Sequence, residues 1–203
     1  MSDDVFEDVL LAAQEGDENA FAQLWRALNP PVVRYLRTLS PSSASDLASE
    51  TWVQVIRNLS KFAGGEPAFR AWVFTIARNK VLDAVRHDHR RPRSSNDDAA
   101  LDRLPSQDDT AQQAMDNLST DAALALIASL PRDQAEVIML RVVAGLDANA
   151  VGVILGKSPG AVRVAAHRGL HRLQELVGRP PVTLSAQPRG IPVTLPARPR
   201  GAL

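Results

Sequence analysis

Apolar side chains recur every three or four residues along most of this 203-residue chain, and this spacing constrains the fold more than any other feature. It places the apolar residues of each stretch on one face of an α-helix. Nowhere do β-branched residues alternate with polar ones between turn residues, as a half-buried strand requires. We therefore predict an all-α fold. The expected helices span residues 4–15, 17–38, 46–59, 69–90, 121–129, 133–143, 147–155 and 158–176.

Local signals predict how several of these helices begin and end. Pro30 and Pro31 are expected to break or kink the second helix, because proline lacks an amide hydrogen. Ser45 or Asp46 is expected to cap the third helix. Pro131 suits the first position of a helix that Gly145 would end.

Charge is unevenly distributed, although the net charge is zero. Residues 70–93 carry seven bases against two acids, and residues 157–179 carry five bases against one acid. Residues 94–123 carry seven acids and one base. Two basic blocks indicate two surfaces for a polyanion, although solvated helix faces would show the same pattern. We expect helical domains at 1–93 and 119–178, a flexible acidic linker at 94–118, and a disordered proline-rich tail at 179–203.

Composition excludes several classes of protein. The absence of cysteine excludes a disulfide framework, a Cys-ligated zinc site and a thiol nucleophile. No apolar run approaches the roughly 18 residues of a membrane span. The acidic N-terminus lacks the basic-then-apolar layout of a secretion signal. We therefore expect a cytoplasmic protein that makes no membrane contact.

The segment 46–59 has a candidate protein-docking face. At 100° per residue, the side chains expected to face the core are Ala48, Trp52, Val55, Ile56 and Leu59. The opposite arc consists of Asp46, Glu50, Val53 and Arg57, with Leu47 and Gln54 beside it. An exposed acid pair beside an exposed leucine suits protein docking, and ordinary solvated charge is the alternative.

The segment 69–91 combines a buried stripe with basic and aromatic residues. Arginines can hold phosphates, and aromatic rings can stack on unpaired bases. Phe69, Trp72 and Phe74 lie near the start of this helix, and core packing is the alternative for most of them. Trp72 lies at the edge of the apolar arc.

The segment 145–170 has the pattern of a helix-turn-helix. Gly152 is small where two helices would cross, Gly156 permits a tight turn, and Val162 would fill the space between the helices. The face expected to be buried in the second helix is Val162, Ala165, Ala166, Gly169, Leu170 and Leu173. The opposite face offers small residues and then hydrogen-bond donors, as a helix in a DNA groove requires. A plain helical hairpin is the alternative.

These three segments together resemble one protein family. Asp46-Leu-Ala-Ser-Glu-Thr-Trp resembles the D-L-x-Q-E-T-F core-polymerase segment of bacterial extracytoplasmic-function sigma factors. Residues 69–86 resemble that family's F-x-x-W-L-x-x-I-A-R-N-x-x-x-D-x-x-R segment, and residues 130–141 resemble the opening of its C-terminal domain. With the helix-turn-helix, the similarity covers about residues 5–178 in the family's order.

The resemblance implies two helical domains, similar to sigma regions 2 and 4, that direct RNA polymerase core to promoters and assist promoter opening. It implies no enzyme activity, no cofactor and no metal. The expected partners are the clamp and flap of the polymerase, promoter DNA and an anti-sigma factor. The acidic linker resembles the segment that threads the polymerase channel near the RNA exit path.

The resemblance also implies three sets of site residues. The polymerase-binding set is Asp46, Leu47, Glu50, Gln54 and Arg57. The set for the −10 element is Lys61, Phe69, Arg70, Trp72, Arg78, Asn79, Arg86 and Arg90. The set for the −35 element is Ser158, Gly160, Arg163, Val164, His167, Arg168 and His171.

Two other classes of function are open to the sequence. A helix-turn-helix regulator could bind duplex DNA without polymerase, but the first domain would then have no role. A metal-dependent hydrolase could use His167 and His171, one helical turn apart, or His87 and His89. No glutamate follows His167, so the H-E-x-x-H arrangement is absent.

Overall fold

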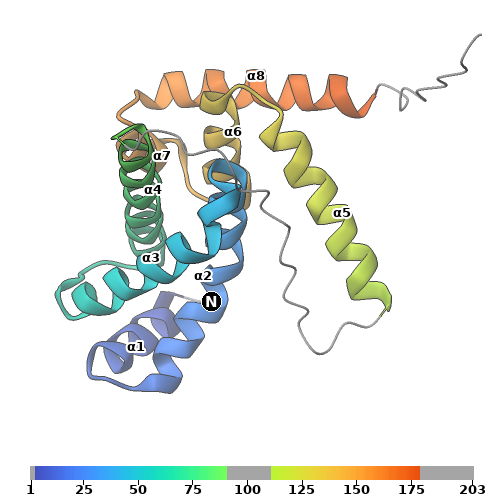
Figure 1. The fold of residues 1–203 in the computed structure, drawn as a ribbon. Helices are drawn as coiled ribbons and strands as arrows, with labels where there is room; N and C mark the ends of the chain where they lie inside the picture. Colours follow the sequence, from blue (N-terminus) through green and yellow to red (C-terminus); the bar gives the residue numbers. More distant parts are fainter. Residues whose placement is uncertain (1–2, 91–110, 179–203) are drawn as a thin grey trace, which may run out of the picture.

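Helices form all the regular secondary structure of residues 3–90 and 111–178, the part of the chain that the computed structural model describes (Figure 1). The predicted all-α class is confirmed for these residues. The first group is α1 (Asp3–Gln14), α2 (Glu18–Leu39), α3 (Ala44–Asn58) and α4 (Glu66–Arg90), with short 3-10 turns η1 (Pro41–Ser43) and η2 (Leu59–Lys61). The second group is α5 (Ala111–Ala128), α6 (Arg132–Ile138), the π-helical turn η3 (Met139–Val143), α7 (Ala148–Leu155) and α8 (Pro159–Val177).

Helix α2 is not broken by its two prolines, so of the predicted break or kink the break is wrong. It runs without interruption through Pro30 and Pro31. The two prolines remove two intrahelical donors, but Leu28, Val32 and Leu36 lie on one buried stripe that packs across this region. Burial of the stripe on both sides of the prolines holds the helix together.

Several helix ends also differ from the prediction. Helix α3 follows Ser43 and has no side-chain cap from Ser45 or Asp46. Helix α4 begins at Glu66, three residues early, and this early turn is closed by an ion pair of 2.7 Å between Glu66 and Arg70. Helix α5 begins at residue 111, inside the segment expected to be linker. Pro131 is the residue before α6 rather than its first residue.

The predicted helix-turn-helix is confirmed in its two helices and the turn between them. The carboxylate of Asp147 caps α7 by accepting from the Ala150 amide at 2.7 Å, and the Ser158 hydroxyl caps α8 in the same way at 3.2 Å. Gly156 has φ +65°, the left-handed conformation that ends α7. Val162 is completely buried between the two helices.

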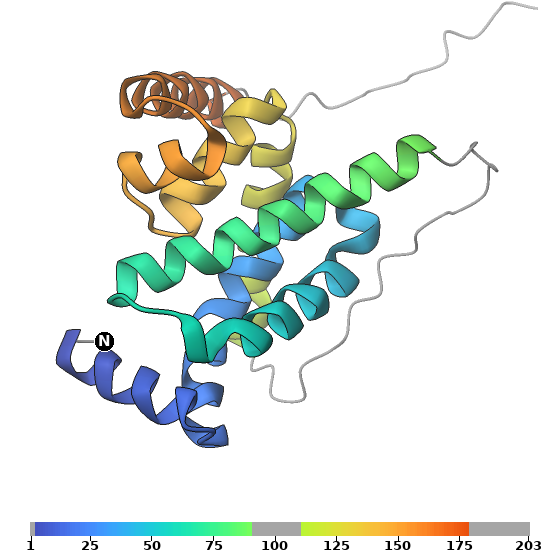
Figure 2. The same ribbon diagram turned by 90° about the vertical axis from the view of Figure 1, so that its left-hand side faces the viewer.

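The two groups of helices pack against each other. Helices α2 and α4 of the first group contact α5, α6, η3 and α7 of the second, and α8 lies on the far side of the second group (Figures 1 and 2). The π-helical turn brings Met139 and Leu140 into the core, where both are fully buried. The buried side chains of both groups therefore form one continuous hydrophobic core.

No helix within residues 3–90 and 111–178 has the length and apolar character needed to cross a bilayer.

We predict that Gly152→Ala destabilises the second group. A Cβ at this position would lie 2.6 Å from the backbone oxygen of Lys157, which cannot move without disturbing the turn. We expect the free energy of unfolding, measured by urea denaturation, to fall by about 1–3 kcal/mol. Gly160→Ala is the matched control, since the nearest atom there is 4.0 Å away. Equal stability of the two variants would contradict this packing.

Candidate nucleic-acid and polymerase interface

The outer face of α3 presents most of the predicted docking residues. Asp46, Glu50, Gln54 and Arg57 are all exposed. Glu50 is also 3.1 Å from the ammonium of Lys80, so one ion pair joins α3 to α4 at the surface. Neighbouring members of this set lie about one turn apart along a single stripe, which suits contact with a flat partner surface.

Two residues of α3 do not lie where the sequence pattern placed them. Leu47 is buried at 5% exposure, and Ile56 is exposed at 56%. The helix contacts both α2 and α4, and its buried arc is turned toward Leu47 and Thr51. The Thr51 hydroxyl tolerates full burial because it donates to the Leu47 carbonyl at 2.6 Å. The exposed apolar residue of the stripe is therefore Val53 rather than Leu47.

A hollow lies where α3, η2 and α4 meet. Its lining includes Asn58, Lys61, Phe62, Trp72 and Ile76. The rings of Phe62 and Trp72 are stacked, with centroids 5.0 Å apart and planes 30° apart. A half-exposed indole beside a cationic side chain and an amide is suited to a planar base with a phosphate attached.

The loop that forms this hollow is held by a residue that sequence reasoning missed. The Gln14 side-chain amide, at the end of α1, donates to the carbonyls of Leu59 and Phe62 at 2.9 and 2.8 Å. These partners are 45 and 48 residues away along the chain. No periodicity or local motif could have indicated this contact.

Phe69 belongs to the core, so we withdraw it from the predicted DNA-binding residues. It is 1% exposed and packs against Phe6 and Phe62, with ring centroids 5.7 and 5.3 Å apart. A ring that is almost completely buried cannot stack on a base. The structure therefore supports the alternative interpretation, in which Phe69 packs in the core.

The remaining candidates on α4 lie on two different faces. Trp72, Asn79 and Arg86 are seven residues apart and share one face, on the side of the hollow. Arg70 and Arg78 lie on another face, toward the second group. The Arg70 guanidinium donates to the Ala144 carbonyl at 3.3 Å as well as to Glu66.

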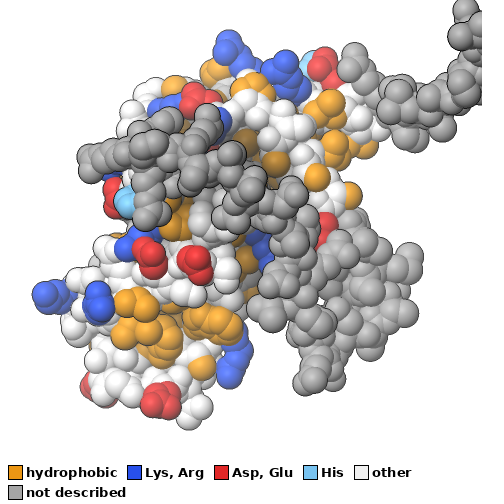
Figure 3. Space-filling view, in the orientation of Figure 1, with side chains coloured by type: hydrophobic (Ala, Val, Ile, Leu, Met, Phe, Trp, Pro, Cys, Tyr) orange, Lys and Arg blue, Asp and Glu red, His pale blue; other side chains and the backbone are white. Residues whose placement is uncertain are grey.

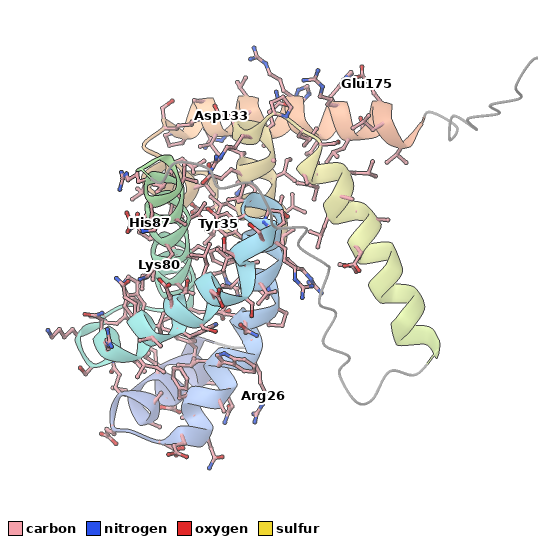
Figure 4. The ribbon with its side chains drawn as sticks, in the orientation of Figure 1. Arg26, Tyr35, Lys80, His87, Asp133 and Glu175 are labelled. Carbon is pink, nitrogen blue, oxygen red and sulfur yellow. The ribbon has the colours of Figure 1, made fainter. Side chains whose placement is uncertain are left out.

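Arg78 is the centre of a polar contact between the two groups. Its Nε donates to the Glu136 carboxylate of α6 at 2.9 Å, and the Tyr35 hydroxyl of α2 donates to the same oxygen at 3.1 Å. Tyr35 lies where α2 passes beside α6 (Figure 4). Burial, and next the negative charge of Glu136, raise the pKa of Tyr35 well above its ordinary value of 10.0. The hydroxyl therefore stays protonated and continues to donate.

All seven candidates on the helix-turn-helix are exposed. Their exposed positions run along one face of α8, and Figure 3 shows Lys and Arg side chains gathered over this helix. One prediction for this helix is wrong: Leu170 is 46% exposed and is not part of the buried face. Gly169 takes the close contact instead, because a Cβ there would lie 3.0 Å from the Ile138 side chain.

The histidines do not form a metal site among the described residues. Within residues 3–90 and 111–178, no group of three or more His, Asp or Glu side chains could hold an ion. The His171 imidazole lies 3.4 Å from Glu175, its neighbour one turn along α8. The side chains of His89 and Arg90 lie outside the described residues.

Comparison with known proteins identifies the family. Residues 24–91 match the family described as Sigma-70 region 2, and residues 120–173 match Sigma-70, region 4. The chain is 40% identical over 177 residues to the ECF RNA polymerase sigma factor ShbA of Streptomyces griseus, covering 81% of this chain and 91% of that protein.

The chain belongs to the sigma-70 family of RNA polymerase sigma factors. A further relative is the ECF RNA polymerase sigma factor SigD of Mycobacterium tuberculosis, 34% identical over 173 residues, covering 82% of this chain and 81% of SigD. The sigma factor RpoE of Bartonella quintana, solved in complex with the anti-sigma factor NepR, is 25% identical. Its TM-score is 0.58, over 77% of this chain and 96% of RpoE.

Membership of the sigma-70 family decides between the functions that the sequence left open. A sigma factor directs RNA polymerase to promoters at transcription initiation, so a regulator that works without polymerase is set aside. The first group of helices, which that alternative left without a role, contains the region 2 match. The family is one of transcription initiation factors.

We predict that Tyr35 of this sigma factor, which is the single tyrosine of the chain, resists ionisation while the protein is folded. Its folded-state pKa is raised, so its contribution to stability is complete below the unfolded-state pKa of about 10 and is lost as the pH rises further. Phenolate absorbance should therefore stay low at pH 10 in buffer and appear at that pH in urea. Equal phenolate absorbance in both solutions would contradict the buried contact with Glu136.

Proposed function

We propose that this sigma factor divides promoter recognition between α8 and the hollow beside Trp72, and that it docks on polymerase through α3. The observation that carries the proposal is the uniform exposure of all seven candidate −35 residues, six on α8 and Ser158 at its N-cap. Small residues at the start of the helix allow close approach to DNA. Arg163 and His167 then supply donors for base edges and phosphates.

The hollow would receive an unpaired base of the −10 element. Lys61 is placed to hold a phosphate, and the exposed side of Trp72 offers a stacking surface. Asn79 and Arg86 continue the same face of α4 and would follow the backbone of the strand. Capture of an extruded base offsets part of the energy spent on unstacking it. Phe69 has no part in this site.

Polymerase docking would use the exposed stripe of α3, which consists of Asp46, Glu50, Val53, Gln54 and Arg57. Its mixture of acids, one base and one apolar residue suits the rim and centre of a protein interface. We assign this stripe to the clamp of the polymerase. The flap is assigned to the second domain.

The remaining expectations complete the proposal. The domains would span 1–93 and 119–178, with the acidic linker at 94–118 in the polymerase channel. The protein would act in the cytoplasm, without enzyme activity, cofactor or metal. An anti-sigma factor would control it, and the complex of the related RpoE with NepR supports this assignment. Mapping the RNA start points that respond to overexpression would supply the promoter for the experiments below.

We predict that Asp46→Arg with Glu50→Arg abolishes binding to core polymerase, measured by fluorescence anisotropy. Both side chains are exposed, and the pair between Glu50 and Lys80 contributes only ~0–1 kcal/mol, so the fold should persist. Glu7→Arg on α1 with Glu15→Arg in the turn that follows it is the control with the same change in charge, since both positions are exposed. Unchanged affinity in the α3 variant, or equal loss in the control, would contradict the docking surface.

We predict that the two DNA sites fail at different steps. Arg163→Ala and His167→Ala should weaken binding to a duplex −35 element by about 1–3 kcal/mol per good base contact. Lys61→Ala and Trp72→Ala should instead slow promoter opening. On a template already melted around the −10 element, transcription by the Trp72→Ala variant should be restored only in part, because this variant also loses stacking on the unpaired base. Gln174→Ala, exposed farther along α8, is the control. Identical defects in both pairs on both templates would contradict the division.

A further inference from the structure

The loop between α3 and α4 is held by one side chain from α1. Gln14, the last residue of α1, donates from Nε2 to the carbonyls of Leu59 and Phe62 at 2.9 and 2.8 Å. The Phe62 amide also donates to the Leu59 carbonyl at 3.0 Å, which closes the short turn η2. A single amide nitrogen has two hydrogens to donate, so Gln14 can hold both ends of this turn at once.

The position of Gln14 is itself fixed by the turn that follows α1. Gly16 has φ +99°, a conformation that reverses the chain and that other residues rarely adopt. The Asp17 carboxylate then caps α2 by accepting from the amides of Asn19 and Ala20 at 2.7 and 3.1 Å. The amide of Gln14 therefore reaches the loop from a defined helix end.

The loop that Gln14 holds carries two residues of the hollow beside Trp72. Lys61 and Phe62 both line this hollow. The Phe62 ring is stacked on the Trp72 indole at 5.0 Å, and it meets the buried Phe69 ring at 5.3 Å. A shift of the loop would therefore move the cationic side chain and the ring that supports Trp72 together.

We propose that Gln14 is a positioning residue for the −10 site, and that its two hydrogen bonds keep Lys61 and Phe62 in the arrangement that receives an unpaired base. This inference rests on the proposed function, since it takes the hollow as the site of that base. Gln14 lies outside the region 2 match, which covers residues 24–91. The residue acts through the loop and is not part of the lining described for the hollow.

The physical reason is the entropy that binding costs. A loop that has to be ordered when DNA binds uses part of the binding energy, whereas a loop already held in place does not. Without the amide of Gln14, the carbonyls of Leu59 and Phe62 would need other donors, because an unpaired carbonyl away from water is costly. The loop would move toward water to find them, and the hollow would lose its shape.

The experiment removes the two donors and measures what one base contributes to binding. Gln14→Met keeps the length of the side chain but cannot donate. Gln23→Met is the matched control, because it makes the same change at an exposed position of α2. Each full-length chain, assembled with core polymerase, is titrated at fixed salt with a template melted around the −10 element. One nucleotide of the melted element at a time is replaced by an abasic site.

The parent and Gln23→Met should show one position at which the abasic site weakens binding about fivefold or more, as loss of a base stacked on an aromatic ring does. In Gln14→Met this loss should shrink to about twofold or less, because coupled contributions do not add. A smaller folded fraction would lower the apparent affinity for both templates equally and leave their ratio unchanged. An undiminished ratio in Gln14→Met would overturn the positioning role.

Two further variants test whether donation is the cause. Gln14→Lys replaces the amide by an ammonium group with three donors, and it should restore most of the ratio. Gln23→Lys controls for the added charge. Gln14→Asn keeps the amide but is one methylene shorter, so it should lose the ratio as Gln14→Met does. If urea denaturation shows that Gln14→Met does not fold, the comparison of Gln14→Lys with Gln14→Asn decides the question, and equal ratios in these two would overturn the role.

The outcomes separate the two proposals. If no abasic site weakens binding by the parent, the hollow does not receive a base, and that part of the proposed function is wrong together with this inference. If the parent shows a base-dependent position and Gln14→Met shows it equally, only the role of Gln14 is wrong.

Discussion

Burial of one stripe of α2 is the constraint on which the rest of the structure depends. This helix contacts α1, α3 and α4 of its own group and α5, α6 and η3 of the other. Val32, Tyr35 and Leu36 are completely buried along it, so their packing outweighs the two donors lost at Pro30 and Pro31. Once α2 is fixed, α3 and α4 have only one face each that can turn inward. Their opposite faces become the surfaces assigned to polymerase and DNA.

The exposed surfaces follow from this packing in a simple way. On α4 the buried stripe leaves two separate flanks, one beside the hollow with Trp72 and one toward the second group with Arg78. On α8, Val162 and Gly169 are buried and Ala165, Ala166, Leu173 and Leu176 are partly buried against the core, which leaves the opposite face exposed. Since α6 and α7 hold the inner face of this helix, its outer face can enter a groove without exposing the core. The helix cap at Ser158 and the turn at Gly156 fix its direction.

Sequence reasoning identified the fold class, the helix-turn-helix and the exposed face of α8, because each depends on periodicity or on local turn chemistry. It failed where a helix has two neighbours. Leu47 and Ile56 exchange their expected environments because α3 packs against both α2 and α4, which rotates the buried arc. Phe69 looked available for a base only because Phe6, far away in sequence, was not known to cover it. Nothing in the sequence pointed to the role of Glu136 in the contact with Arg78, since a single glutamate on a short helix is ordinary.

The polar contact at Glu136 is best understood from what an apolar one would do. Replacing Tyr35, Arg78 and Glu136 by well-packed hydrophobic side chains would join the two domains more firmly, because no charge would have to be desolvated. A guanidinium that is largely buried at this contact needs an anionic partner, because an unpaired buried charge is costly. Glu136 meets this requirement at 2.9 Å, and the loss of hydration of both charges limits the net strength of the contact.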